Sequence, residues 1–429
     1  MKKILIISYF FPPCNLTASQ RAHSWAKHLK EFGYEPVVVT RRWDEHVESF
    51  SDLSKGTVNE MKKEENGAYE AHYLPYHPNK RDRLYVKHGE ERKVFFRKAL
   101  SFMELLLQNN FNAFVPFSNL YEYAYMLLQK DRNIKGMIAT GNPYILFKFA
   151  YLLNQKHNIP WIADYRDAWT TSEIDSVGKG KLFRLLRKRD AKFEKKWVGT
   201  ASYVTASSEP IAKKIEKLTG TKAHPLYNGF DEEVLKTEQK DKYEHFTISY
   251  IGMLYPGQNI EIFCEALKKL IDEKDKPAIR LLFPGISFHK EQENRIKEFM
   301  KGHEEHFECT ERVPRNEILE MEKRSHLLLH VAWKGYSGVI ASKIYEYIAS
   351  GTKIIVTPSD KGAIEQIVKK SGCGDLTNTV EETYEFLNEE YEKYLKGEFD
   401  SNDVNREEVL QFSRKRQVGE LAGLLDEIL

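Results

Sequence analysis

The chain has 429 residues, a length that predicts two domains of about 200 residues each. Hydrophobic residues make up 41% and charged residues 30% of the sequence, a balance that excludes a disordered or fibrous protein. The net charge of +2 is unevenly divided, since residues 1–200 carry 33 Lys and Arg against 22 Asp and Glu, whereas residues 201–429 carry 32 against 41.

The cysteines and the N-terminal segment indicate the compartment. Cys14, Cys264, Cys309 and Cys373 form no C-x-x-C pair and have no histidine at ligand spacing. We therefore expect neither a zinc site nor a disulfide framework, and we expect the protein to reside in a reducing compartment. The apolar run at residues 4–11 is half as long as a membrane span and lacks a cleavage site. These features predict a cytoplasmic protein.

The first half of the chain alternates between strand and helix patterns. Residues 3–8 form a continuous apolar run, typical of a strand buried on both faces. Helical spacing follows at residues 18–30, and a second strand is predicted at 36–40. The same alternation recurs at 136–140, 144–155, 160–164 and 202–207. Units of this kind build parallel sheets.

The second half repeats the pattern. Strands are predicted at residues 246–252, 279–283, 326–330 and 353–357, with helices at 259–273, 342–350 and 411–429. The sequence thus predicts an α/β protein with two doubly wound, Rossmann-like domains, residues 1–206 and 207–410, joined by a hinge within 207–245. Ligands of such sheets bind at the carboxyl ends of the strands.

The motifs present and absent limit the classes of reaction that the protein could catalyse. No G-x-G-x-x-G follows a strand and no phosphate-binding P-loop is present, which argues against a dinucleotide dehydrogenase and a P-loop nucleotidase. The Gly-containing loop at 335–338, followed by a helix that starts near Ser342 and Lys343, is typical of an anion cradle. Glu346 lies on the same helical face, where a carboxylate suits ribose hydroxyls. The alternative is that Lys343 and Glu346 form an exposed ion pair.

Six segments, in this order, carry a family resemblance: residues 9–13 with Arg21 on the following helix, 139–143, 160–169, 227–231, 250–252 and 342–351. Their order and spacing resemble the family-4 glycosyltransferases of GT-B fold, in particular bacterial polysaccharide-assembly members. The resemblance implies two domains that face a central cleft, an acceptor in the first domain, a nucleotide-sugar donor in the second, and transfer with retention of configuration. It also implies that the last helix, 411–429, crosses back to the first domain.

The chain departs from this family at its donor contacts. Met253 and Gln258 occupy places where many members have an Arg and a Lys that grip the donor diphosphate, and Gly338 stands where the first of two glutamates is expected. We expect the amides of Gly257 and Gln258 to bind a phosphate. The missing charge must then come from Lys343, Arg21 or Arg166.

Polar residues follow the strand predicted at 160–164. Asp164 or Asp167 is a candidate base for an acceptor hydroxyl, beside Arg166, although a strand-end ion pair is the structural alternative. Trp169 is expected to stack on a sugar. Asn15 and Thr17, after the first strand, are further candidate acceptor contacts.

Two basic stretches interleaved with Phe and Leu suggest a surface partner. Residues 80–98 hold eight basic and three acidic residues, and residues 179–196 hold nine and two. Such helices bind anionic lipid at a membrane interface, although solvated faces are the alternative. We hypothesise peripheral association with the inner face of the cell membrane. No nucleic-acid-binding motif accompanies the charges.

The sequence therefore predicts a glycosyltransferase that transfers a hexose-type sugar from a nucleotide diphosphate sugar, UDP-sugar favoured, to a saccharide or lipid-linked saccharide in bacterial surface polysaccharide or glycoconjugate synthesis. No D-x-D motif is present, so we expect no metal and no other cofactor. The alternatives are a sugar-nucleotide epimerase of the same fold and a binding protein without turnover.

Overall fold

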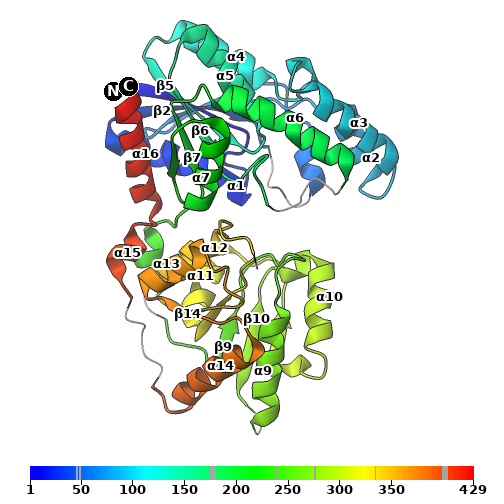
Figure 1. Cartoon of the computed structure of the whole chain (residues 1–429), viewed down its shortest axis with the longest axis vertical. Helices are drawn as coiled ribbons and strands as arrows, with labels where there is room; N and C mark the ends of the chain where they lie inside the picture. Colours follow the sequence, from blue (N-terminus) through cyan, green and yellow to red (C-terminus); the bar gives the residue numbers. More distant parts are fainter. Residues whose placement is uncertain are drawn as a thin grey trace. The chain divides into compact units, whose positions relative to one another are not determined.

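The computed structural model describes residues 1–44, 47, 50–173, 180–236, 240–274, 277–333, 335–398 and 404–429. Within it the chain forms two compact units (Figure 1). Unit 1 comprises Met1–Tyr227 and Gln417–Leu429, and unit 2 comprises Asn228–Arg416. Lys179, the first residue of the second basic stretch, lies outside the described residues.

Unit 1 is built on an eight-stranded sheet with the order β3-β4-β2-β1-β5-β6-β7-β8, parallel except between β3 and β4. The strands are β1 (Lys2–Ser8), β2 (Tyr34–Arg41), β3 (Lys62–Glu65), β4 (Glu70–Leu74), β5 (Ile134–Gly141), β6 (Trp161–Tyr165), β7 (Tyr203–Ala206) and β8 (Ala223–Pro225). The helices are α1 (Thr17–His28), α2 (Lys80–His88), α3 (Val94–Leu107), α4 (Asn119–Lys130), α5 (Ile145–His157), α6 (Lys181–Val198) and α7 (Glu209–Thr219).

Helices cover both faces of this sheet, which explains the uninterrupted apolar run of β1. Leu5 and Ile7 belong to the hydrophobic cluster on one face, and Ile4 and Ile6 to the cluster on the other. The C-terminal helix α16 (Arg414–Ile428) completes the second cluster with Val418, Leu421 and Leu425, among others. All of these side chains are fully buried, as expected for a strand with two covered faces.

The boundary between the units differs from the predicted one. The first domain was expected to end at residue 206, but β8 pairs in parallel with β7 and unit 1 continues to Tyr227. The strand β8 has three half-buried residues and no apolar run, so no local pattern marks it as a strand. At the other end, the residues that return to unit 1 begin at Gln417 rather than at 411.

Unit 2 contains a parallel six-stranded sheet with the order β11-β10-β9-β12-β13-β14. The strands are β9 (Phe246–Ser249), β10 (Ile279–Phe283), β11 (Phe307–Cys309), β12 (Leu327–His330), β13 (Lys353–Val356) and β14 (Gly374–Leu376). The helices are α8 (Glu233–Lys236), α9 (Glu261–Glu273), α10 (Lys290–Phe299), α11 (Arg315–Arg324), α12 (Lys343–Ser350), α13 (Ala363–Ser371), α14 (Val380–Leu395) and α15 (Arg406–Leu410). Because β9 and β12 are parallel neighbours, the segments that follow them leave from the same edge of the sheet.

Candidate functional site

Lys343 starts α12 at the carboxyl edge of the sheet in unit 2. Its Nζ lies 3.4 Å from the centroid of the Tyr250 ring, directly after β9. The nitrogen is shielded from solvent and has no hydrogen-bond partner among the described residues. Burial holds the pKa of Lys343 well below its ordinary value. The amine can therefore donate hydrogen bonds to an acceptor that the described residues do not supply.

His330, the last residue of β12, contributes a second buried nitrogen that lacks a hydrogen-bond partner among the described residues. Its ring is fully buried, and its Nδ1 has no partner in the described part of the chain. Burial and the neighbouring Lys343 lower the pKa of His330 to about 3. Leaving a buried polar group unpartnered costs about 1–3 kcal/mol. A phosphate oxygen at this point would offer Lys343 an acceptor.

Glu346 does not form the ion pair with Lys343 that we considered as the alternative. Its Oε1 lies 2.6 Å from Nη1 of Arg315, at the start of α11. The side chain of Glu346 remains partly exposed, so one carboxylate edge stays within reach of a ligand. Ser342 precedes α12, and its side chain makes no capping hydrogen bond to the helix.

The expected phosphate contact at Gln258 is wrong, because both of its polar ends are used inside unit 2. Its backbone N–H donates to the Tyr255 carbonyl at 3.0 Å. Its side-chain Nε2 donates to the Val331 carbonyl at 2.5 Å, and the residue is only 2% exposed. Gln258 thus ties the segment after β9 to the segment after β12.

Gly257 lies against an aromatic ring. A Cβ placed on Gly257 would approach Cζ3 of Trp333 to 2.5 Å, so only glycine fits there. The Trp333 ring is also 5.5 Å from that of Tyr255, centroid to centroid. This aromatic contact sets the course of the chain ahead of α9, which begins only at Glu261.

In unit 1, Asp164 and Arg21 bind each other rather than a substrate. Arg21 on α1 donates from Nη2 to Oδ1 of Asp164 at 2.6 Å and from Nε at 3.0 Å. The hydroxyls of Thr140 and Thr205 donate to the same carboxylate at 2.8 and 2.7 Å. Asp164 is fully buried and Arg21 nearly so. The expectations of a base at Asp164 and a donor contact at Arg21 are therefore corrected to a structural anchor that joins α1 to the sheet.

The residues that follow β6 lie nearer the surface. Nε of Arg166 donates to Asp167 at 2.9 Å, and the Asp167 side chain is largely exposed. This is the strand-end ion pair of the alternative interpretation. The indole of Trp169 stacks on Tyr144 and Trp197, with centroids 5.1 and 5.8 Å apart. Part of its stacking surface is therefore taken by the protein's own rings.

A pocket of about 370 Å³ opens beyond the carboxyl ends of β1, β4, β5 and β6 in unit 1. Aromatic rings and polar side chains line it together. They include Tyr9, Phe117, Tyr144, Trp169, Glu104 and Asp190. Neither Asn15 nor Thr17 is among the lining residues, and the Oδ1 of Asn15 accepts a hydrogen bond from the Val47 amide at 2.9 Å. This mixture of rings and polar groups is suited to a sugar.

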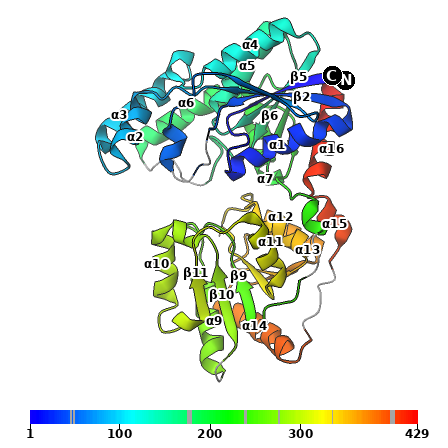
Figure 2. The ribbon, with the colours of Figure 1, turned by 180° about the vertical axis from the view of Figure 1, so that it is seen from behind.

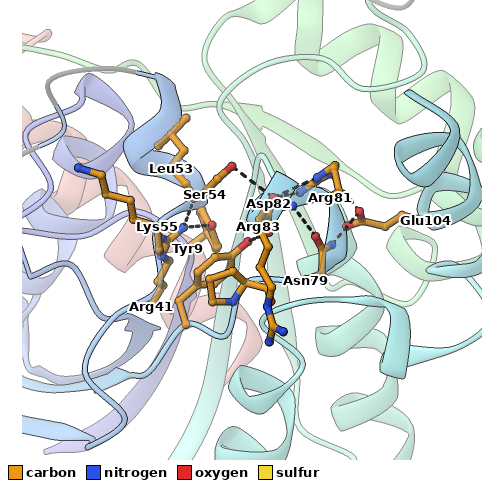
Figure 3. A network of polar contacts seen from close by, with 12 residues as sticks. Tyr9, Arg41, Leu53, Ser54, Lys55, Asn79, Arg81, Asp82, Arg83 and Glu104 are labelled. Carbon is orange, nitrogen blue, oxygen red and sulfur yellow. Dashed lines mark hydrogen bonds and ion pairs between the residues drawn. The ribbon is translucent and has the colours of Figure 1, made fainter. Parts of the chain in front are cut away.

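A polar network holds one wall of this pocket (Figure 3). Asp82 on α2 accepts hydrogen bonds from Tyr76 at 2.5 Å, from Arg81 at 2.8 Å and from Ser54 at 3.2 Å. Arg81 also lies 3.0 Å from Glu104 on α3. The network fixes α2 and α3 against the segment at Ser54, so the wall is formed before any ligand binds.

Comparison with known proteins gives the fold. No protein-family model and no curated protein sequence matches the chain. Among solved structures, sucrose-phosphate synthase from Thermosynechococcus elongatus is similar over 100% of this chain and 99% of its own, with a TM-score of 0.65 and 12% identity. HepE from Anabaena, in complex with UDP-glucose, is similar over 100% of both chains, with a TM-score of 0.58 and 12% identity. An α,α-trehalose-phosphate synthase (UDP-forming) from Burkholderia vietnamiensis covers 100% of this chain and 97% of its own, at 0.63 and 10%.

The chain has the GT-B fold. Of the residues predicted for the GT-B donor site, Lys343 and Glu346 lie on one helix in unit 2, whereas Arg21 is buried in unit 1. From the sequence, Arg315 was not a candidate and His330 was interpreted as structural. Arg315, the partner of Glu346, and His330, the neighbour of Lys343, both come from segments distant in the sequence. Across the described ranges, no cluster of three or more His, Cys, Asp or Glu is arranged to hold a metal ion, and no helix has the length and apolarity needed to cross a bilayer.

Proposed function

We propose that this GT-B protein is a glycosyltransferase whose donor is a nucleoside diphosphate sugar, a UDP-sugar in particular. The proposal rests on one observation, the two shielded nitrogens of Lys343 and His330, which have no hydrogen-bond partner among the described residues. Because they lie at the carboxyl edge of a parallel sheet, beside the start of α12, they suit a phosphate group. Similar structures that contain UDP-glucose or are named UDP-forming add support.

The proposed reaction retains the configuration of the sugar. The bond between the anomeric carbon and the phosphate oxygen breaks, and the acceptor oxygen bonds to the same face of that carbon. The acceptor proton passes to an oxygen of the leaving nucleoside diphosphate, so no protein base is needed and the burial of Asp164 is no obstacle. Lys343, protonated once the diphosphate is bound, stabilises the charge on the leaving group. The scheme includes no metal ion and no other cofactor.

The proposed acceptor is a saccharide or a lipid-linked saccharide in bacterial surface polysaccharide or glycoconjugate synthesis. It would occupy the aromatic and polar pocket of unit 1, next to the exposed pair Arg166 and Asp167. Family-4 membership and peripheral attachment to the inner face of the cell membrane are part of the same proposal. The clustering of exposed basic residues in the first half of the chain supports this attachment.

Nucleotide binding is the first test. Thermal shifts are measured against UDP, GDP, ADP, CMP and dTDP and their sugars, and a ligand at a hundred times its Kd adds about 2.7 kcal/mol of stability. We expect the uridine series to raise the melting temperature and Lys343→Ala to abolish the rise. Lys353→Met, which alters a lysine paired with Glu390, is the control and should keep it. No shift with any nucleotide would contradict the proposal.

Turnover separates the remaining functions. Incubation of the donor with and without saccharide acceptors, followed by NMR, reports product formation and anomeric configuration. Retained configuration and undiminished turnover in EDTA are the expected results. Conversion of the donor alone would instead identify an epimerase, and binding without any turnover would identify a binding protein.

A further inference from the structure

The exposed apolar side chains of unit 1 are concentrated on α2, α3 and α6. Phe95 and Phe96 on α3 are 79% and 59% exposed, and Leu185 on α6 is 65% exposed. Val86, Phe102, Met103, Leu182 and Phe183 on these helices are also exposed, as are Phe111 and Phe114, which follow α3. No residue of α3 is fully buried, although its sequence is mainly apolar. The core of unit 1 therefore does not account for these side chains.

Contacts join the three helices into one layer. The Arg189 guanidinium on α6 donates to the Leu105 carbonyl on α3 at 2.8 Å. Asn109, just after α3, donates to Asp190 at 3.0 Å, and Arg81 on α2 pairs with Glu104 on α3. Figure 1 and Figure 2 show these helices grouped at one end of unit 1. We call this layer the α2-α3-α6 surface.

Acidic and basic side chains of these helices point in different directions. The four acids, Asp82, Glu104, Asp190 and Glu194, are all buried or partly buried and are bound to partners inside unit 1. The exposed charges on the helices are basic: Lys80, Arg83, Lys87, Lys98, Lys181, Arg184, Arg187, Lys188, Lys192, Lys195 and Lys196. Exposed acids, Glu90 and Glu91, occur only in the turn between α2 and α3 among the described residues of this layer. The α2-α3-α6 surface thus presents positive charge together with Phe and Leu.

A second pocket, of about 350 Å³, lies between α2 and α3. Arg81, Arg97, Lys98, Tyr85 and Ser101 contribute to its lining, with Glu90 as its acid. The Nε of Arg97 is shielded from solvent and has no hydrogen-bond partner among the residues described. Its guanidinium lies 4.7 Å from the centroid of the Tyr85 ring. Arg81 is paired with Asp82 and Glu104, and Nη2 of Arg97 donates to the Glu90 carbonyl. The Nε of Arg97 and the amine of Lys98 are therefore the groups that suit a phosphate.

We propose that the α2-α3-α6 surface docks on an anionic lipid bilayer and that the pocket at Arg97 receives a headgroup phosphate. Phenylalanine and leucine enter the boundary between headgroups and acyl chains, while lysine and arginine are attracted to the negative surface. The exposed charges of the three helices are basic and lie among exposed Phe and Leu side chains, which complements an anionic bilayer in both charge and polarity. The inference rests on the membrane attachment within the proposed function and deepens it, because it assigns that attachment to the α2-α3-α6 surface and to a phosphate pocket. Docking itself requires neither the donor nor transfer.

Flotation with vesicles tests the docking. The full chain is mixed with vesicles of phosphatidylcholine alone or of phosphatidylcholine with phosphatidylglycerol, and bound protein is measured at low and high salt. We expect binding to the anionic vesicles that weakens as salt rises. No binding at low salt, or equal binding to both vesicles, would overturn the inference.

Matched variants locate the surface. Phe95→Ser combined with Phe96→Ser should lower vesicle affinity at least tenfold, about 1.4 kcal/mol, whereas Leu395→Ser, at a side chain 57% exposed on α14, should leave it unchanged. Arg97→Gln should weaken anionic binding about fivefold, and Lys213→Gln on α7 should not. Because α3 buries no residue, the melting temperature should stay the same. Unchanged affinity in the phenylalanine variant overturns the proposal.

Two further measurements separate the competing outcomes. Sedimentation velocity would reveal a dimer that the phenylalanine variant dissolves, which would make the surface a contact between copies of this chain and overturn the bilayer proposal. Nucleotide-induced thermal shifts on the same samples report the donor site independently. Vesicle binding without a nucleotide shift contradicts the donor site of the proposed function and leaves the docking intact. A nucleotide shift without vesicle binding contradicts the docking and the membrane attachment, and leaves the donor site intact.

Discussion

Replacement of Lys343 by methionine should stabilise the protein that carries no ligand. The Nζ of Lys343 is buried against the Tyr250 ring and has no hydrogen-bond partner among the described residues, and a polar group without one costs about 1–3 kcal/mol. Methionine is one atom shorter than lysine, keeps most of the apolar stem and removes the polar atom, so the cost of the unpartnered amine disappears. A gain of 1 kcal/mol raises the melting temperature by about 2–4 °C for a unit of this size. Differential scanning calorimetry of the free protein measures the change.

Lys353→Met is the matched control for this prediction. Its Nζ lies 2.8 Å from Glu390 and 3.1 Å from Asp375, and Glu390 is buried. The substitution leaves that carboxylate without this partner, so the melting temperature should fall. If Lys343→Met lowers the melting temperature as far as Lys353→Met does, Lys343 has a partner in the protein and the reasoning behind the donor site is refuted.

The remaining predictions concern proton uptake, the buried anchor and the glycine contact. A bound diphosphate favours the charged form of Lys343, whose pKa is held low in the empty protein. Binding should therefore take up a proton at any pH between the lowered and the restored pKa of Lys343. Calorimetry in buffers of different ionisation enthalpy detects this uptake, and binding heats that do not depend on the buffer would contradict the prediction. Asp164→Asn removes the charge that neutralises buried Arg21 and should cost about 3–5 kcal/mol, read from denaturant midpoints, where a loss below 1 kcal/mol would be inconsistent with the anchor. Gly257→Ala places a Cβ against Trp333 and should weaken nucleotide binding in titrations, whereas an unchanged Kd would mean that the ring moves aside freely.

Sequence patterns predicted the fold through its buried strands. Short apolar stretches such as residues 3–8 and 279–283, the second interrupted by the exposed Arg280, predicted strands, and β1 and β10 lie there. The short edge strand β8 and the antiparallel strand β3 carry no such run. The predicted boundary at 206 was early for that reason.

Side-chain partners were harder to predict than strands. Arg21 and Asp164 are 143 residues apart, and nothing in their spacing indicates that they pair. Glu346 likewise finds Arg315 on another helix. By contrast, the position of Lys343 at a helix start after a Gly-containing loop was a local pattern, and its buried amine has no hydrogen-bond partner among the described residues. Local patterns located the elements, whereas tertiary contacts decided which charges remain available.

The exposure of α3 has an evolutionary consequence. Since none of its residues is fully buried, folding of unit 1 constrains the α3 sequence only weakly, and most surface substitutions change stability by less than about 0.5 kcal/mol. Mutations along α3 can therefore accumulate without loss of the fold. Selection for contacts outside the protein can then change the α3 sequence, so α3 can diverge between relatives faster than the strands of the sheet.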